Sequence, residues 1–296
     1  MAEVRPFQAW RYDLSKVGKL DRVIAPPYDV IDSALSDQLH AQSPHNVIRL
    51  ILDPILPTDD DSNNRYTRSA KTLAEWKASG MVKEDARPAF YVYYETFLWE
   101  GKEYTRKGFM GRVRLEKFGQ GKIYPHEQTM SGPKADRLKL FHATGMNLSQ
   151  IFGLFPDDAS VISKRLDQAV AGKEALEAVD HLGVKHQVWM IDDPATTAEL
   201  STLLADKPIF IADGHHRYET SIKHMEEREA AGQVNGPDAP ERFTLMMLVA
   251  MSDPGLQVMP THRLVRGVGP LTAEQLSSKL APCFDTQIVG EGIEAG

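Results

Sequence analysis

Cysteine is nearly absent from this sequence, whose 296 residues include only Cys283. A single cysteine excludes an internal disulfide bond and a metal cluster held by several thiolates. It also suits a reducing compartment. The first residues contain no apolar signal region, and no apolar stretch approaches the ~20 residues that span a bilayer. These absences predict a soluble, cytoplasmic protein with no membrane partner.

An excess of positive charge is also missing. The formal net charge is -7, because 41 Asp and Glu residues outnumber 34 Lys and Arg residues. Proteins that bind nucleic acid generally need a basic face, since neutralising phosphates dominates their affinity. We therefore expect no nucleic-acid partner, although a local basic pocket is compatible with this charge.

Several well-known catalytic motifs are absent too. The sequence has no P-loop, no glycine loop of the kinase type and no Gly-x-Ser-x-Gly elbow. It has no His-Glu-x-x-His helix, so no metal site is certain. Scattered residues that can bind metals are His126, Glu127, His215, His216, Glu219 and His262. Magnesium that bridges phosphates needs only one or two carboxylates, which Asp213, Asp29 or Glu127 could supply.

The composition is that of a globular protein, with 42% apolar and 25% charged residues. We expect an α+β fold with a mixed sheet and flanking helices. Two parts, 1–155 and 156–296, are expected to pack as one unit. The tail starts a further strand near residues 285–289 and stops, which suggests a fragment of a longer protein.

Local patterns predict the individual elements. Strands are expected over residues 46–52, 90–99, 103–113, 185–191, 208–212, 243–251 and 256–265. Helices are expected over residues 32–40, 66–79, 161–178, 196–204, 216–231 and 271–280. Residues 5–31 look extended, and residues 121–150 look like an irregular polar segment.

The richest cluster of functional groups is Asp213-Gly214-His215-His216-Arg217, which follows a buried strand and opens a helix. Asp213 is expected to cap the helix, and Gly214 permits a close approach of a ligand. A helix N-terminus offers amide donors and a positive dipole end, and Arg217 adds a fork suited to phosphate oxygens. The histidines can move protons. The alternative is a plain strand–turn–helix junction with surface histidines.

A second cluster lies within residues 124–149. His126 and Glu127 are acid–base groups, and Glu127 is a candidate general base. Thr129 is a candidate substrate contact, while Lys134 and Arg137 could neutralise a transferring phosphoryl group. The alternative is a solvated loop with salt bridges.

A third cluster begins at Pro26-Pro27, which stiffens the segment that presents Tyr28 and Asp29. Asn46 and Arg49 follow it as candidate substrate contacts. The alternative is a rigid turn. Far along the chain, His262 belongs to a Pro-Thr-His-Arg segment that more often forms a surface pair.

These residues together resemble the bacterial and archaeal domain-of-unknown-function 1015 family, in order from residue 5 to about residue 265. The motifs that carry the resemblance are Arg5-Pro6-Phe7, Ala25-Pro26-Pro27-Tyr28-Asp29-Val30, Asn46-Val47-Ile48-Arg49-Leu50, His126-Glu127-x-Thr129, Lys134-x-Asp136-Arg137 and Asp213-Gly214-His215-His216-Arg217-Tyr218-Glu219-Thr220. Members of the family are commonly longer than this chain.

More distantly, the Gly-His-His-Arg turn is similar to the Gly-Cys-His-Arg turn of sulfiredoxin and the Gly-Glu-Arg-Arg turn of ParB-type domains. In that superfamily the turn holds nucleotide phosphates, and some members are free-serine kinases. Gly214, His216 and Arg217 carry over. His215 replaces the reactive cysteine of sulfiredoxin, so peroxiredoxin repair is not implied. The basic DNA-binding domain of ParB has no counterpart.

We therefore expect a nucleotide-dependent phosphotransferase that uses ATP or ADP with Mg²⁺ on a small hydroxyl metabolite such as serine. The Asp213–Arg217 turn would hold phosphates with Lys134 and Arg137. Glu127 or Asp29 would activate the hydroxyl, with help from His126 and His216. The alternatives are a non-catalytic nucleotide or phosphometabolite sensor and a metal-dependent phosphate-ester hydrolase. The oligomeric state is not predicted, and which histidine faces the site stays open.

Overall fold

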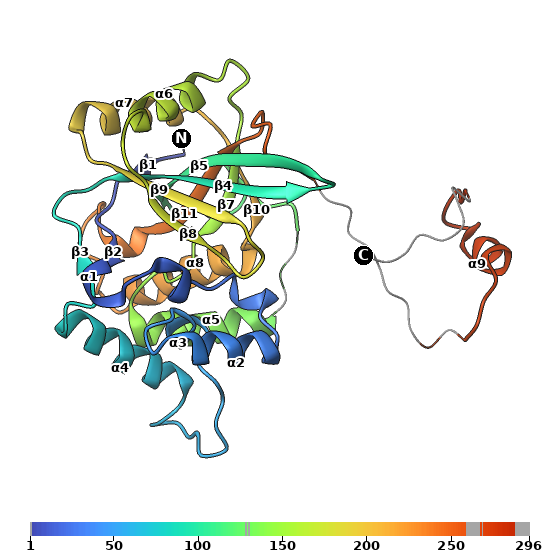
Figure 1. The fold of residues 1–296 in the computed structure, drawn as a ribbon, viewed down its shortest axis with the longest axis horizontal. Coiled ribbons are helices and arrows are strands. Elements are labelled where there is room, and N and C mark those ends of the chain that lie inside the picture. Colours follow the sequence, from blue (N-terminus) through green and yellow to red (C-terminus); the bar gives the residue numbers. More distant parts are fainter. Residues whose placement is uncertain (1, 128, 130, 259–266, 268, 288–296) are drawn as a thin grey trace. The chain divides into compact units, whose positions relative to one another are not determined.

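The computed structural model describes residues 2–127, 129, 131–258, 267 and 269–287. It divides into two compact units, Met1–Leu256 and Gln257–Gly296. In the second unit, helix α9 (Ala273–Leu280) begins with a capping box between Thr272 and Gln275. The first unit is the larger body of the ribbon in Figure 1.

One mixed sheet organises the described part of this unit. Its strand order is β6-β10-β7-β11-β5-β4-β9-β8, with β1 paired to β5 beside this path. The strands are β1 (Val4–Arg5), β4 (Phe90–Trp99), β5 (Lys102–Arg114), β6 (Ile123–Tyr124), β7 (Ile151–Phe155), β8 (Leu176–Val179), β9 (Lys185–Ile191), β10 (Ile209–Asp213) and β11 (Phe243–Ala250). β10 runs parallel to β6 and β11 parallel to β7, whereas the other pairs are antiparallel. The predicted α+β class with a mixed sheet is confirmed, and the sheet takes strands from both sides of residue 155.

Helices cover both faces of the sheet. They are α1 (Leu14–Val17), α2 (Ser33–Gln42), α3 (Ile48–Ile51), α4 (Arg65–Ala78), α5 (Ser131–Thr144), α6 (Val161–Val170), α7 (Pro194–Leu204) and α8 (His215–Ala230), with short 3-10 helices η1 (Leu20–Arg22), η2 (Tyr28–Val30) and η3 (Pro240–Arg242). In Figure 1, α6 and α7 lie on one face, while α8, α5 and the N-terminal helices lie on the other. A small sheet of β2 (Trp10–Tyr12) and β3 (Val82–Glu84) stands apart from the main sheet.

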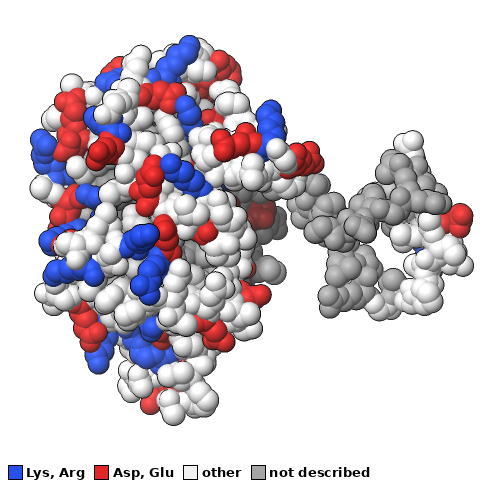
Figure 2. Space-filling view, in the orientation of Figure 1, with Lys and Arg blue, Asp and Glu red and all other residues white. Residues whose placement is uncertain are grey.

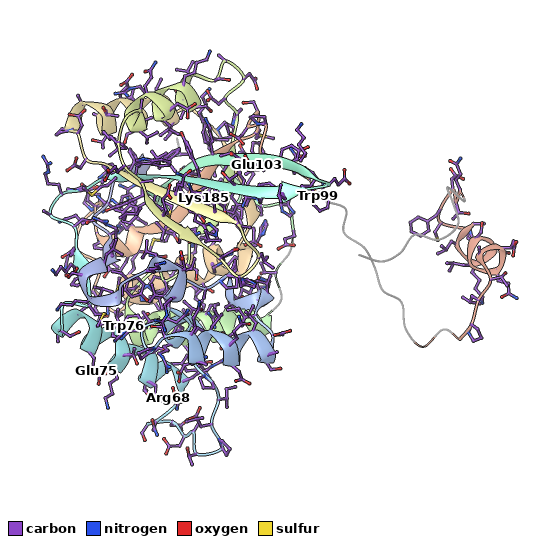
Figure 3. The ribbon with its side chains drawn as sticks, viewed as in Figure 1. Arg68, Glu75, Trp76, Trp99, Glu103 and Lys185 are labelled. Carbon is purple, nitrogen blue, oxygen red and sulfur yellow. The ribbon has the colours of Figure 1, made fainter. Side chains whose placement is uncertain are left out.

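Two apolar clusters hold these layers together. The larger one includes Phe90 and Val92 of β4, Ile162 of α6, Leu200 of α7 and Tyr218 of α8. The smaller one forms around α4, whose Leu73 and Trp76 are buried one helical turn apart. Trp76 lies on the inner side of α4 in Figure 3. An N-terminal capping box of Asn64 and Thr67 sets where this helix starts.

The hairpin predicted over residues 90–113 is present as β4 and β5. Glu95 lies opposite Arg106 in its register. Figure 3 shows Trp99 and Glu103 near its far end. The strongly β-prone aromatic run and the turn at residues 100–101 were therefore sufficient local signals.

Three predicted elements are wrong. Residues 46–52 are not a strand but contain α3, because an apolar run this short is equally compatible with a buried helical turn. The helix expected over residues 161–178 ends at Val170, and Gly172 turns the chain with a positive φ before β8. The irregular segment at residues 121–150 contains α5.

Other expected elements are only partly testable. Residues 5–31 contain short strands and helical turns as well as extended chain. Residues 256–258 are not a strand, and the remainder of the strand expected over 256–265 lies largely outside the described residues. Residues 285–287 are without regular structure, and the rest of that expected strand also lies outside.

Gly108 of β5 lies against β11 with no room for a side chain. A Cβ atom there would lie 2.5 Å from the Leu248 carbonyl oxygen and 2.7 Å from Met247 Cε. We expect Gly108→Ala to lower the free energy of unfolding by about 1–3 kcal/mol, as overpacking usually does. Lys102→Ala, at an exposed position of the same strand, is the control. Equal urea midpoints for the two variants would contradict this prediction.

Candidate functional site

The turn between β10 and α8 is built around Gly214. Its φ of 91° lies in the left-handed region, which glycine tolerates at little cost. The first backbone bond of the helix runs from the Tyr218 N–H to the Gly214 carbonyl, so Gly214 is the cap residue. The prediction that Asp213 caps the helix is wrong. Its carboxylate instead accepts a hydrogen bond from Arg217.

Arg217 folds back over this turn. A Cβ atom at position 214 would lie 2.9 Å from Arg217 Nη2 and 3.0 Å from its Cζ, so any other residue would displace the guanidinium from this position. The guanidinium also donates to the Gln150 carbonyl and pairs with Asp213. Only 12% of the Arg217 side chain is exposed. The cation is therefore held at the start of α8, over the end of β10.

His215 fastens the opposite side of the turn. Its buried ring accepts a hydrogen bond at Nε2 from the His126 backbone N–H, at 3.2 Å. Nδ1 therefore carries the proton of the neutral ring and lies 3.0 Å from Glu127 Oε1. The contact is poorly directed for a hydrogen bond. Burial lowers the pKa of His215 from 6.5, and the Glu127 carboxylate opposes this only in part.

The sequence left open which of His215 and His216 faces the site, and the structure places the two side chains differently. His215 is buried inside the turn, whereas His216 is half-buried. The His126 ring packs edge-on against His215, and its Nε2 lies 3.1 Å from the Ala212 carbonyl oxygen. His126, Glu127 and His215 thus lie together. They join the segment before α5 to the end of β10.

The two cations of the second cluster both have carboxylate partners. Lys134 donates to Glu219 at 2.7 Å, and the Thr129 hydroxyl donates to the same carboxylate oxygen. Burial works against the charged form of Glu219, but these hydrogen bonds outweigh it and lower its pKa. Glu219 is thus the partner that the sequence did not assign to Lys134.

Arg137 is a buried bridge between helices. It donates to Asp136 and, at 2.9 Å, to the Ile51 carbonyl oxygen. Its guanidinium lies 4.0 Å from the centre of the Tyr28 ring. Tyr28, Arg137 and Arg217 border a small pocket of about 50 Å³. The structure therefore brings the first and third sequence clusters together at Arg217.

The other predicted substrate contacts are used differently. Asn46 is fully buried and donates to the carbonyls of Arg22 and Ile24, while its side-chain oxygen accepts from the Ile48 N–H. Arg49 donates to the His40 carbonyl oxygen. These bonds make both residues part of the N-terminal framework. Asp29 is exposed on η2, and His262 lies outside the described residues.

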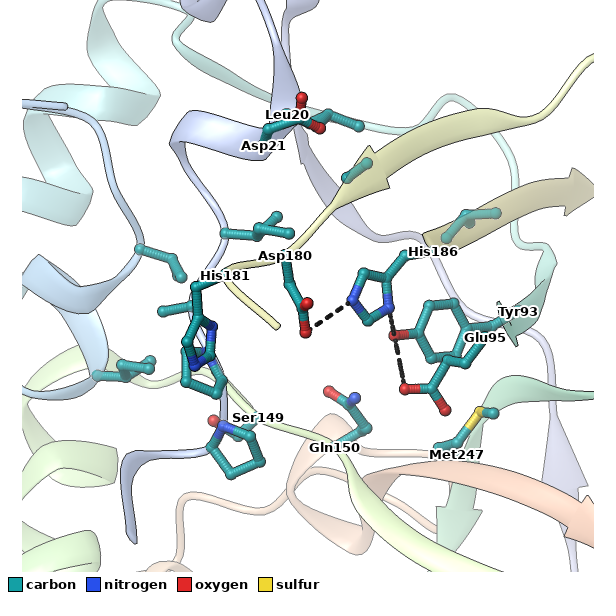
Figure 4. A pocket seen from close by; sticks show the side chains of 18 of the residues that line it. Leu20, Asp21, Tyr93, Glu95, Ser149, Gln150, Asp180, His181, His186 and Met247 are labelled. Atoms are coloured by element: carbon teal, nitrogen blue, oxygen red, sulfur yellow. Dashed lines mark hydrogen bonds and ion pairs between the residues drawn. The ribbon is translucent and has the colours of Figure 1, made fainter. Parts of the chain in front are cut away.

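A cavity of about 620 Å³ opens between the sheet and the N-terminal helices (Figure 4). Asp213 and Arg217 line it from the turn. Apolar walls come from Ile24, Pro26, Pro27, Leu39 and Val47. Sequence patterns missed the polar floor of this cavity, which comprises Tyr93, Glu95, Arg106, Asp180 and His186.

The floor is a row across three strands. Glu95 of β4 lies opposite Arg106 of β5 on one side and His186 of β9 on the other. Arg106 Nε donates to Glu95 Oε2 at 2.9 Å. Side chains at i and i+2 of a strand share a face, so Tyr93 lies beside Glu95 over the cavity. This alternation was the signal available in the sequence.

His186 is the centre of a chain of polar contacts in this floor. Its Nδ1 lies 2.6 Å from the Tyr93 hydroxyl, and its Nε2 lies 3.3 Å from Asp180 Oδ2. The Tyr93 hydroxyl is also 3.3 Å from Glu95 Oε1. Figure 4 shows Tyr93 between His186 and Glu95. Burial, with the nearby Glu95 charge, raises the pKa of Tyr93 far above its usual value, so this hydroxyl keeps its proton.

Charges on the outside of the molecule are mixed. Lys and Arg side chains alternate with Asp and Glu over the face shown in Figure 2. In the part of the chain that the structure describes, no group of three His, Cys, Asp or Glu side chains is arranged to hold a metal ion. Within those same residues, no helix has the length and apolar character needed to cross a membrane.

Comparison with known families supports the resemblance seen in the sequence. Residues 4–294 match the family described as Protein of unknown function (DUF1015). The chain belongs to the DUF1015 family. This DUF1015 chain matches no curated protein and no solved structure. The cavity and the turn must therefore be interpreted from their own geometry.

Asn46 gives a test of the framework behind the cavity. In this DUF1015 chain, Asn46→Ala would remove two hydrogen bonds to backbone carbonyls and leave the buried Ile48 N–H without its acceptor. An unsatisfied buried group costs about 1–3 kcal/mol, so we expect the free energy of unfolding in urea to fall by that amount. Asn63→Ala, on an exposed loop, is the control. A loss no larger than that of the control would show that Asn46 has no such role.

The lowered pKa of His215 predicts acid sensitivity. Its folded-state pKa lies below the 6.5 of the unfolded chain, so unfolding takes up a proton between these values. The stability that the neutral His215 contributes is fully present above pH 6.5. It is lost as the pH falls through the pKa of His215 in the folded protein. We expect His215→Gln to unfold at a temperature that depends less on pH in this window. The buried His224, whose pKa burial also lowers, will keep part of the dependence.

His181→Gln is the matched control, because His181 is exposed. The prediction fails if the pH slopes of the unfolding temperature are the same for His215→Gln and the parent protein.

Proposed function

We propose that the protein binds a nucleotide in the 620 Å³ cavity and transfers a phosphoryl group to a small hydroxyl metabolite. The observation that carries this proposal is Arg217, a cation held over the first turn of α8 and lining the cavity. The first four N–H groups of a helix have no acceptor within it, so helix starts favour phosphate. A guanidinium at the same place adds two parallel donors.

The size and the walls of the cavity support a nucleotide. Small-molecule sites usually enclose ~300–1,000 Å³ and are mostly apolar with a few placed polar groups. Pro26, Pro27 and Leu39 offer an apolar wall for a base or ribose. Phosphates would then lie toward Asp213 and Arg217. The proposal also draws on the similarity of the Gly-His-His-Arg turn to ParB and sulfiredoxin proteins, in which the turn holds nucleotide phosphates.

Magnesium fits the donor set at one point. Mg²⁺ usually keeps several waters and binds through one or two carboxylates together with substrate phosphates. Asp213 is such a carboxylate, since it lies at the end of β10 beside Arg217. In the proposed complex, Asp213 would hold Mg²⁺, and the ion would neutralise phosphate charge.

The roles of the other predicted residues follow from their partners. Lys134 and Arg137, paired with Glu219 and Asp136, are proposed to support the site rather than to contact phosphate. Glu127 and His126 hold the turn through His215. Direct roles for Glu127, His126, Asp29 or His216 in proton transfer remain predictions.

A non-catalytic sensor is the second candidate. The observation that favours it is the pairing of Arg217 with Asp213, because phosphate can replace the carboxylate without any reaction. The third candidate, a metal-dependent hydrolase, would need a group of metal ligands that the described residues do not form.

Arg217→Ala tests the binding step. We expect it to weaken binding of ATP or ADP with Mg²⁺ by at least about tenfold in calorimetry, because charge-assisted hydrogen bonds contribute ~1.5–3 kcal/mol. The fold should be preserved, as judged by circular dichroism. Lys223→Ala, at a solvent-facing position of the same helix, is the control. Unchanged nucleotide affinity in Arg217→Ala would remove the proposal.

The reaction itself is tested by incubating the protein with ATP or ADP, Mg²⁺ and a panel of hydroxyl metabolites that includes serine. A phosphorylated product supports the phosphotransferase. Binding without product supports the sensor, and no binding of either nucleotide rules out both.

A further inference from the structure

The polar floor of the cavity contains more hydrogen-bond acceptors than hydrogen atoms that can be donated to them. In the neutral His186 ring, Asp180 attracts the one proton to Nε2, which leaves Nδ1 as an acceptor. The Tyr93 hydroxyl then faces two acceptors, His186 Nδ1 and Glu95 Oε1, with a single proton. One of these contacts is always unsatisfied in the neutral state.

One added proton removes this conflict. A protonated His186 donates from Nδ1 to the Tyr93 oxygen and keeps its Nε2–H beside the Asp180 carboxylate, 3.3 Å away. The Tyr93 hydroxyl is then free to donate to Glu95. The positive imidazolium would lie beside a carboxylate at each end of the chain. The geometry of these four residues is therefore that of a proton acceptor.

We propose that Asp180, His186, Tyr93 and Glu95 form the group that accepts the proton of the substrate hydroxyl during phosphoryl transfer. This inference rests on the proposed function. The substrate oxygen forms a bond to the γ-phosphorus, and the bond from that phosphorus to the bridging oxygen breaks, so the electron pair leaves on the nucleoside diphosphate. The substrate proton passes to Tyr93 Oη as the Tyr93 proton passes to His186 Nδ1.

The surrounding charges are consistent with this role. Arg106, from β5, pairs with Glu95 and offsets one of the two carboxylates. Asp180 is the carboxylate left to stabilise the imidazolium, and His181 follows it in the same turn. Asp21 of η1 borders the cavity from the N-terminal wall. The side chains of Glu95, Asp180 and His186 are 16%, 18% and 17% exposed, so they are shielded but accessible to a ligand.

This group and the proposed phosphate site at Arg217 lie on different elements of the fold. Tyr93, Glu95 and His186 stand on the sheet, whereas Arg217 stands on α8, and all line one cavity. His186 is assigned as the catalytic proton acceptor and Tyr93 as the relay. Asp180 is a positioning residue that acts through His186.

A measurement independent of turnover tests the proton acceptor. In the full chain labelled with ¹⁵N-histidine, the His186 signals are assigned by their loss in His186→Gln, and the ring tautomer is read from the two ¹⁵N shifts. We expect the proton of the neutral ring on Nε2, and we expect Asp180→Asn to move it toward Nδ1, because the carboxylate that faces Nε2 is lost. Asp158→Asn, at an exposed aspartate, should leave the tautomer unchanged. A ring proton found on Nδ1 in the parent protein, or a tautomer that Asp180→Asn does not alter, overturns the inference.

A kinetic experiment uses ATP, Mg²⁺ and the hydroxyl metabolite that the panel identifies as the substrate. Tyr93→Phe and His186→Gln should lower kcat by ~10²–10⁴-fold, the usual contribution of general acid–base catalysis. Their affinity for ATP should match that of the parent, whereas Arg217→Ala should lose it. Asp180→Asn should lower kcat without changing the affinity for ATP. Retained kcat in His186→Gln overturns the inference while leaving the proposed function intact.

If the panel gives no product, the phosphotransferase proposal fails and the kinetic role of His186 fails with it. The tautomer measurement still decides whether Nδ1 of His186 is the acceptor that faces Tyr93.

Discussion

The guanidinium of Arg217 against the backbone of Gly214 is the contact on which the candidate site depends. A positive φ at Gly214 and the absence of a Cβ atom let the cation lie within van der Waals contact of the turn. From there it binds the Gln150 carbonyl, just before β7, and the Asp213 carboxylate at the end of β10. One side chain thus joins two neighbouring strands to the start of α8 and directs positive charge to the cavity.

The other half of the site depends on sheet register. Phe90 and Val92 of β4 point into the core beneath α6 and α7, so Tyr93 and Glu95 must point to the opposite face. A slip of one residue would reverse both sets, exchanging apolar side chains in the core for polar ones. The packing of one face therefore stabilises the row of Arg106, Glu95 and His186 on the other. Core and site are two sides of the same strands.

This division explains what the sequence could predict. The hairpin, the strand before Asp213 and the helix after it depend on residues close together in the chain, and their patterns predicted them. The run at residues 46–52 misled because its apolar residues carry no period that separates a strand from a helical turn. The turn at Asp213 was found because its functional groups are consecutive. The floor was missed because Glu95 and His186 meet only through strand pairing, which the sequence of neither strand reveals by itself.

The pairing of Asp213 with Arg217 affects how a ligand would bind. An anion that takes the Arg217 guanidinium must displace Asp213, so part of its interaction with the cation replaces an existing ion pair. The released carboxylate then lies beside the incoming phosphate, where two negative charges repel each other. A divalent cation between them converts this repulsion into attraction, which links nucleotide affinity to Mg²⁺ on the proposed function. The same reasoning separates the two ends of the cavity. Glu95 keeps Arg106 as its partner, so His186 can take up a proton without disturbing the proposed phosphate site at Arg217.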